Sequence, residues 1–328
     1  MFGTASIGLV ILRRLAQAVP TILGVVAINF VLLHLLHGDI VDALTADAPS
    51  TGVDFKAQLR SQMGLDQSLP VQFLIYMGHL LRFDFGYSYA NSQPVLDVLG
   101  ARIGPTLLLM FSSILLATVV SVVMGVYAAR KVNTWRDNLI MLVALIFYAT
   151  PVFWTGLMMI VLFAVKLNWL PVGGFATIGA SFDALGGILD VLRHLAMPMT
   201  ALALFFLAVY TRLTRASMLE VYGLDFVRTA RAKGLSERYI AFRHVLRNAL
   251  LPVVTMVGLQ AGAVLGGAVV IETVFSWPGL GRLAYEAVLQ RDYQVLLAIL
   301  FFAAIFVIVA NLLVDLVYAR LDPRITIR

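Results

Sequence analysis

The sequence predicts an all-α integral membrane protein with six transmembrane helices. Of its 328 residues, 61% are hydrophobic and only 13% are charged, and the mean hydropathy is +0.92. A soluble domain is nearer half apolar and a quarter charged, so this chain lacks the polar surface of a water-soluble globule. The composition excludes a soluble enzyme, a free nucleic-acid-binding protein and a disordered chain. The absence of cysteine excludes disulfide frameworks and thiolate metal sites.

Charge-free runs place the expected spans, because a helix needs about 20 apolar residues to cross a bilayer core. Six runs of at least 18 residues contain no Asp, Glu, Lys or Arg: 15–38, 103–129, 138–165, 194–211, 248–271 and 293–314. The first run is longer than the apolar core of a signal peptide. We therefore expect it to remain in the protein as an anchor.

The basic residues predict the orientation of the chain. Four segments carry 16 Lys or Arg against 5 acids, and the rest of the chain carries 8 against 13; the four segments are 1–14, 130–137, 212–247 and 319–328. The positive-inside rule makes these segments, and both termini, cytoplasmic. The chain then divides into residues 1–38 with the first span, an external region 39–102, and a five-span core over 103–328. The external region holds an apolar stretch (71–81) too short to cross, and we expect a cap of short helices there.

No phosphate-binding loop is present in the sequence. A Walker A motif needs a lysine directly after glycine, and none of the four lysines, Lys56, Lys131, Lys166 and Lys233, follows one. No GxSxG or HExxH motif marks a membrane enzyme either. We therefore predict a non-catalytic chain with no cofactor of its own. ATP-driven transport would need a partner ATPase, whereas a self-sufficient ion-coupled secondary transporter is the alternative and a lipid-binding scaffold is a third possibility.

The cytoplasmic segment 212–247 predicts a helix, a tight turn and a second helix. Residues 224–233 are typical of one helix, and Gly234 suits the left-handed position that ends it. Ser236 can cap the next helix, with Glu237 in its first turn, where the helix dipole favours an acid. The pattern fits either a basic amphipathic helix held by anionic lipid headgroups or a docking element for a cytoplasmic partner.

The stretch DFVRTARAKGLSERYIAFRHVLRNALLP (225–252) resembles the EAA loop of ABC-importer permeases, in the form found in the peptide and nickel class. Residues 63–89, 150–174, 272–283 and 311–324 resemble the same class in their regions, and the long external region resembles the first of its two permease subunits. Arg228, Thr229 and Ala230 stand where the general pattern has Glu-Ala-Ala. The Arg-rich version is typical of this class.

The resemblance implies a type I ABC-importer permease fold in the bacterial inner membrane, and import of peptides or a related small solute. It also implies a second homologous permease, two ATPase subunits that bind ATP and Mg, an external substrate-binding protein, and no nucleic acid. The ATPase-coupling residues that it implies are Arg228, Thr229, Ala230, Arg231, Ala232, Lys233, Gly234, Leu235, Ser236, Glu237 and Arg238.

Small residues recur in the fifth span. Gly258, Gly262 and Gly266 are four residues apart, a spacing that lets a neighbouring helix come close in lipid. Static helix packing is the favoured interpretation and a pathway-lining surface is the functional alternative. Gln260 fits a water-filled path or an interhelical hydrogen bond.

Two pairs of polar residues lie near span ends, and we interpret both pairs as ordinary residues of the membrane interface. His34 and His37 share a helix face as metal ligands would, but a membrane interface is an ordinary place for solvated histidines, so we predict no metal site. Glu272 and Asp315 are the acids nearest to a span. Acids inside a membrane can mark proton relays or ion sites. These two lie at span ends, with Trp277 near Glu272, so we expect them to be interface anchors.

Overall fold

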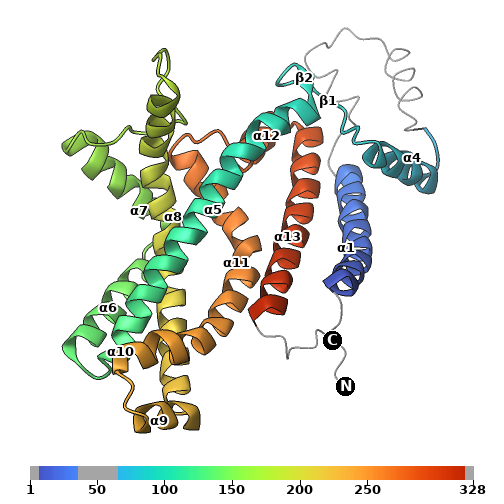
Figure 1. Ribbon diagram of the computed structural model, residues 1–328. Helices are drawn as coiled ribbons and strands as arrows, with labels where there is room; N and C mark the ends of the chain where they lie inside the picture. Colours follow the sequence, from blue (N-terminus) through green and yellow to red (C-terminus); the bar gives the residue numbers. More distant parts are fainter. Residues whose placement is uncertain (1–6, 36–65, 322–328) are drawn as a thin grey trace. The chain divides into compact units, whose positions relative to one another are not determined.

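A computed structural model describes residues 7–35 and 66–321 of the chain, and almost all of its regular structure is helical (Figure 1). The helices, in chain order, are α1 (Ile7–Leu35), α4 (Leu69–Leu81), α5 (Val95–Arg130), α6 (Trp135–Ala149), α7 (Val152–Met159), the π-helix η1 (Ile160–Lys166), α8 (Ala184–Tyr222), α9 (Asp225–Ala232), α10 (Glu237–Tyr239), the π-helix η2 (Ile240–Val245), α11 (Leu246–Val274), α12 (Leu280–Gln290) and α13 (Tyr293–Leu321). Two short strands, β1 (Tyr87–Ser88) and β2 (Gln93–Pro94), pair antiparallel.

Among the described residues, five helical segments are long and apolar enough to cross a membrane: Arg14–Leu32, Val95–Arg130, Ala184–Tyr222, Glu237–Gln260 and Tyr293–Leu313. Helix α6 and the pair α7–η1 pass the same test only together, and they bend by 100° at a short break. The six-span prediction therefore holds when this bent pair is one span.

The break in the third expected span follows from Pro151. Helix α6 ends at Ala149, and Thr150 is extended, with φ −87° and ψ 128°. A residue before proline is driven out of the helical region by the proline ring, and proline has no N–H to continue the helix. Counting charges over 138–165 could not reveal this backbone break.

The chain forms two compact units. The first contains Ile7, residues 104–282 and the described residues from 310 onward, and the second joins the described parts of 8–103 to 283–309. In the first unit α8 is the central helix. More than half of its apolar window is buried within the chain, whereas the other four long segments named above bury less than a third of theirs. Helices α6, α7 and α11 all pack on α8.

Helices α5 and α8 approach each other closely within the first unit. A Cβ atom at Gly125 would lie 2.5 Å from Thr214 Cβ and 3.0 Å from the Thr211 carbonyl oxygen. Ser121 Oγ donates to the Leu207 carbonyl, 3.2 Å away, across the same interface. Only glycine allows this separation at position 125, because any side chain would push the two backbones apart.

The second unit packs α1 and α4 against α13. Val26, Leu80 and Phe301 form its buried cluster, and the buried Asn29 side chain donates to the Leu297 carbonyl at 3.2 Å. Ser88 of the hairpin donates to Asp292 at 2.5 Å. The described part of the expected cap therefore holds one short helix and the hairpin, while residues 39–65 lie outside the described residues.

Candidate functional site

The predicted coupling segment is a helix, a turn and a second helix, as its local signals indicated. Helix α9 ends in a Schellman motif, in which Leu235 N donates to the Ala230 carbonyl at 3.3 Å and Gly234 N to the Arg231 carbonyl at 2.9 Å. Gly234 has φ +78°. Ser236 caps α10 by accepting from Tyr239 N at 3.4 Å, so two capping residues fix the path of the turn.

Buried apolar side chains fix the coupling segment to three membrane helices. Val227 and Ala230 are the buried residues of α9. They belong to a cluster that also contains Val126 and Ala129 of α5, Met218 and Val221 of α8, Ile240 and Val245 of η2, and Ala249 of α11. Helix α9 is therefore packed in one core with the ends of α5, α8 and α11.

An ion pair closes the turn between the two helices of the segment. Arg231 Nε donates to Glu237 Oε1 at 2.7 Å, and Nη2 to Oε2 at 3.3 Å. This hydrogen bond raises the pKa of Arg231 above its ordinary value. The guanidinium also lies over the Tyr222 ring, 5.8 Å from its centre. Arg231 therefore joins the end of α8, α9 and the start of α10.

The remaining predicted coupling residues form an exposed polar surface. Arg228 contacts Asp225 at 3.6 Å, and Thr229 Oγ1 donates to the Asp225 carbonyl at 3.0 Å. Exposed positions on the same surface are Ala232, Lys233, Gly234, Leu235, Ser236, Glu237 and Arg238. A Cβ at Gly234 would meet nothing within 4 Å in this chain, so the turn is open to an approaching molecule.

Five large hydrophobic side chains of the segment are also exposed. Leu224, Phe226 and Leu235 expose 47%, 40% and 37% of their surface, and Tyr239 and Phe242 expose 50% and 51%. Exposed apolar side chains next to a rigid polar turn are typical of a protein-binding surface.

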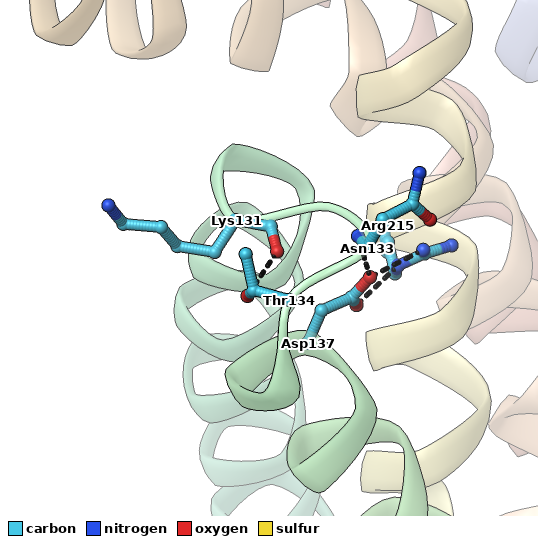
Figure 2. A network of polar contacts seen from close by, with 5 residues as sticks. All are labelled: Lys131, Asn133, Thr134, Asp137 and Arg215. Atoms are coloured by element: carbon cyan, nitrogen blue, oxygen red, sulfur yellow. Dashed lines mark hydrogen bonds and ion pairs between the residues drawn. The ribbon is translucent and has the colours of Figure 1, made fainter.

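A second polar cluster at the same end of the first unit was not predicted from the sequence. Arg215 of α8 donates to both carboxylate oxygens of Asp137, Nε to Oδ1 and Nη2 to Oδ2, each at 2.7 Å. Asn133 N donates to Oδ2 at 3.1 Å. Figure 2 shows these groups converging from the α5–α6 turn and from α8. The Asp137 side chain is 2% exposed and that of Arg215 is 25% exposed, so this is a largely buried, forked ion pair.

The opposite end of the first unit contains a buried carboxylate, and here the interface-anchor prediction for Glu272 is wrong. Glu272 is fully buried, as is Trp277. Thr106 Oγ1 donates to Glu272 Oε1 at 2.7 Å, and Arg282 N donates to Oε2 at 3.0 Å. The Trp277 ring N–H donates to the Pro105 carbonyl at 2.9 Å. Glu272 and Trp277 therefore hold the loop after α11 inside the protein, where their polar groups find partners.

The loop between η1 and α8 packs against the loop that follows α11. A Cβ at Gly173 would lie 2.2 Å from the Phe275 carbonyl oxygen, and Gly174 N donates to that oxygen at 2.8 Å. Asp190 of α8 holds the loop from its other side, because it accepts from Thr177 N and Thr177 Oγ1, each at 2.7 Å. These contacts make the end of the first unit near Glu272 a closely packed structure.

The glycine series of the fifth span lies in α11. Gly258 is buried, Gln260 is partly buried and Gly266 is exposed. A Cβ at Gly266 would meet nothing within 4 Å, whereas one at Gly267 would lie 3.2 Å from Leu202 of α8. Gly262 belongs to the same helix. Gly267, next to the predicted series, is thus a position of close packing on α8.

His34 uses both ring nitrogens within the second unit. Nδ1 hydrogen-bonds with the Phe30 carbonyl at 2.8 Å and Nε2 with Gln72 Oε1 at 2.9 Å. His37 and the side chain of Asp315 lie outside the described residues. The part of the chain that is described contains no group of three or more metal-binding side chains.

Comparisons with known proteins identify the family. Residues 121–327 match the binding-protein-dependent transport system inner membrane component family, and residues 9–110 match its N-terminal membrane component. The chain is 40% identical, over 96% of its length and 98% of theirs, to the oligopeptide transport system permease protein AppB of Bacillus subtilis and the glutathione transport system permease protein GsiC of Salmonella typhimurium.

Solved structures support the fold. An inward-facing structure of the MetNI methionine ABC transporter superposes with a TM-score of 0.56 at 17% identity, covering 69% of this chain and 97% of that one. A second crystal form gives a TM-score of 0.55. The chain therefore belongs to the binding-protein-dependent transport system inner membrane component family and is the permease subunit of an ABC importer.

Proposed function

We propose that this permease imports peptides or a related small solute, as one half of a translocation pathway completed by a second homologous permease. The observation that carries this proposal is the 40% identity, over nearly the whole length, to permeases of oligopeptide and glutathione systems. Glutathione is itself a short peptide. The similarity therefore favours peptide cargo over an unrelated solute.

The complete transporter in this proposal contains two ATPase subunits, which bind ATP and Mg, and an external binding protein, which delivers the cargo. The permease itself carries no cofactor. It lies in the bacterial inner membrane with both termini in the cytoplasm, as its charge distribution favours.

The coupling segment is the proposed contact with an ATPase subunit. Its support is the combination of a core attached to α5, α8 and α11 with an exposed face around Gly234 and Leu235. A segment that is rigid on the membrane side and open on the cytoplasmic side can pass a displacement from a partner to the spans.

The function is tested by uptake into vesicles that contain the permease with its partners. We expect radiolabelled di- and oligopeptides to accumulate only with ATP and the binding protein, and to do so after an ionophore has collapsed all ion gradients. Uphill uptake by the permease alone, driven by an ion gradient, would overturn the proposal.

Substitutions at Gly234 test the coupling segment. Asn tolerates the left-handed backbone that Gly234 adopts, so Gly234→Asn is the matched control for the bulky Gly234→Trp. We expect Gly234→Trp to insert in the membrane, to lose co-purification with the ATPase and to lose uptake, while Gly234→Asn retains both. Equal uptake by the two variants would contradict the coupling role.

Single thiols test the orientation, since the native chain has no cysteine. Lys233 and Gln93 are both exposed and lie on the proposed cytoplasmic and external sides. An impermeant thiol reagent added to intact spheroplasts should label Gln93→Cys and should label Lys233→Cys only after lysis. The reverse pattern would refute the orientation.

A further inference from the structure

The Asp137–Arg215 pair lies at the end of the first unit that carries the coupling segment, which we call its coupling end. Asp137 is in the first turn of α6. Arg215 is seven residues before the end of α8 at Tyr222, and α8 leads directly into α9. The pair therefore joins the start of one span to the helix that carries the coupling segment (Figure 2).

The turn before Asp137 is itself fixed in place. Asn133 has φ +61°, and its N–H donates to Asp137 Oδ2. Thr134 Oγ1 and Thr134 N donate to the Lys131 carbonyl at 2.6 Å and 3.1 Å. One carboxylate thus holds the α5–α6 turn and α8 together, with two donors from Arg215 and one from the turn.

Packing extends this connection along α6. Ala144 of α6 is buried with Leu207 and Ala208 of α8, and Tyr148 stacks on Phe205 with ring centres 6.1 Å apart. Beyond Tyr148 the span breaks before Pro151. Helix α6 is therefore attached to α8 along its whole length, and Asp137 supplies the polar attachment at the coupling end.

Stability alone does not explain a buried ion pair at this position. Replacing a buried pair with apolar residues of similar volume is often neutral or stabilising, whereas removing one partner is costly. What a forked pair adds is geometry, because two parallel hydrogen bonds fix both the distance and the orientation of the two groups. Apolar side chains could slide past one another as α8 moves.

We propose that Asp137 and Arg215 are positioning residues that make α6 and the α5–α6 turn move with α8 and the coupling segment during each ATP-driven cycle. The inference rests on the proposed contact between the coupling segment and an ATPase. Without the pair, movement of α9 and α8 reaches α6 incompletely, and ATP is hydrolysed without a matching movement of cargo.

The test compares ATP hydrolysis and uptake in the complete transporter in vesicles. The variants are Asp137→Asn, Arg215→Lys and the double variant Asp137→Leu/Arg215→Met. The control is Asp84→Asn, which cuts an exposed pair in which Asp84 lies 2.8 Å from His79. For each variant, the cargo imported per ATP hydrolysed and the thermal midpoint in detergent are measured.

The two single variants should import at least about 5-fold less cargo per ATP, the lower end of typical coupling effects, with ATP hydrolysis changed less than about 2-fold. The double variant should recover the wild-type thermal midpoint but not the import ratio, and Asp84→Asn should match the wild type. Wild-type ratios in the single variants, or recovery of midpoint and ratio together in the double variant, would overturn the proposal. Failure of the wild-type complex to import peptide with ATP would instead refute the proposed function.

Discussion

The close approach of α5 and α8 at Gly125 makes a specific prediction for Gly125→Ala. The new methyl group would lie 2.5 Å from Thr214 Cβ, 2.8 Å from Thr214 Cγ2 and 3.0 Å from the Thr211 carbonyl oxygen. Carbon atoms in favourable contact are about 3.5–4.0 Å apart. The two helices must therefore separate by about 1 Å, because the Thr211 backbone cannot rotate away as a flexible side chain could.

Two opposing effects set the change in the free energy of unfolding that Gly125→Ala causes. Overpacking a well-packed core by one methyl group costs about 1–3 kcal/mol, while replacing glycine by alanine inside a helix contributes about 0.8–1 kcal/mol in the other direction. We therefore expect Gly125→Ala to lower the free energy of unfolding by up to about 2 kcal/mol, and to be about 1–3 kcal/mol less stable than an alanine substitution without the clash.

Gly104 provides the matched control on the same helix. A Cβ there would meet nothing within 4 Å, so Gly104→Ala keeps the propensity gain without the clash. Unfolding by SDS in mixed micelles, followed by circular dichroism, measures both variants under identical conditions. The reasoning is refuted if Gly125→Ala is as stable as Gly104→Ala.

Two further predictions concern the buried carboxylate of Glu272 and the Ser236 cap of α10. Glu272→Leu leaves the Thr106 hydroxyl and the Arg282 N–H without this acceptor and should lower the free energy of unfolding by about 3 kcal/mol in the same SDS assay. Glu272→Gln keeps one acceptor oxygen and should cost less. Equal stability of the Glu272→Leu variant and the wild type would contradict this account. Ser236→Ala removes the cap of α10 and should cost about 0.5–1 kcal/mol of local stability. This loss should appear as about 2- to 5-fold faster hydrogen exchange at the amide of Tyr239. Ser236→Thr is the control, and unchanged exchange in Ser236→Ala would contradict the prediction.

The sequence predicted the parts of the coupling segment that depend on near neighbours. Gly234 and Ser236 act on residues within five positions of themselves, so capping rules are enough to place the turn. The charge-free runs likewise found the apolar helices, because lipid solvation depends on composition.

Contacts between distant residues could not be predicted in this way. Asp137 and Arg215 are 78 positions apart, and in the sequence they count only among the charges of two segments predicted to be cytoplasmic. Glu272 and Thr106 are 166 positions apart. Because hydropathy identifies where a span ends but not what folds over that end, Glu272 was wrongly assigned to the membrane interface.

The exposed apolar side chains of the coupling segment have a consequence for how the cell must make this subunit. Leu224, Phe226, Leu235, Tyr239 and Phe242 are exposed in this chain by itself, and exposed apolar surfaces of this kind favour aggregation. Molecules synthesised in excess over the rest of the transporter would present them to proteases and chaperones. If the proposed ATPase contact covers these side chains, balanced production of all the subunits would keep them from being exposed.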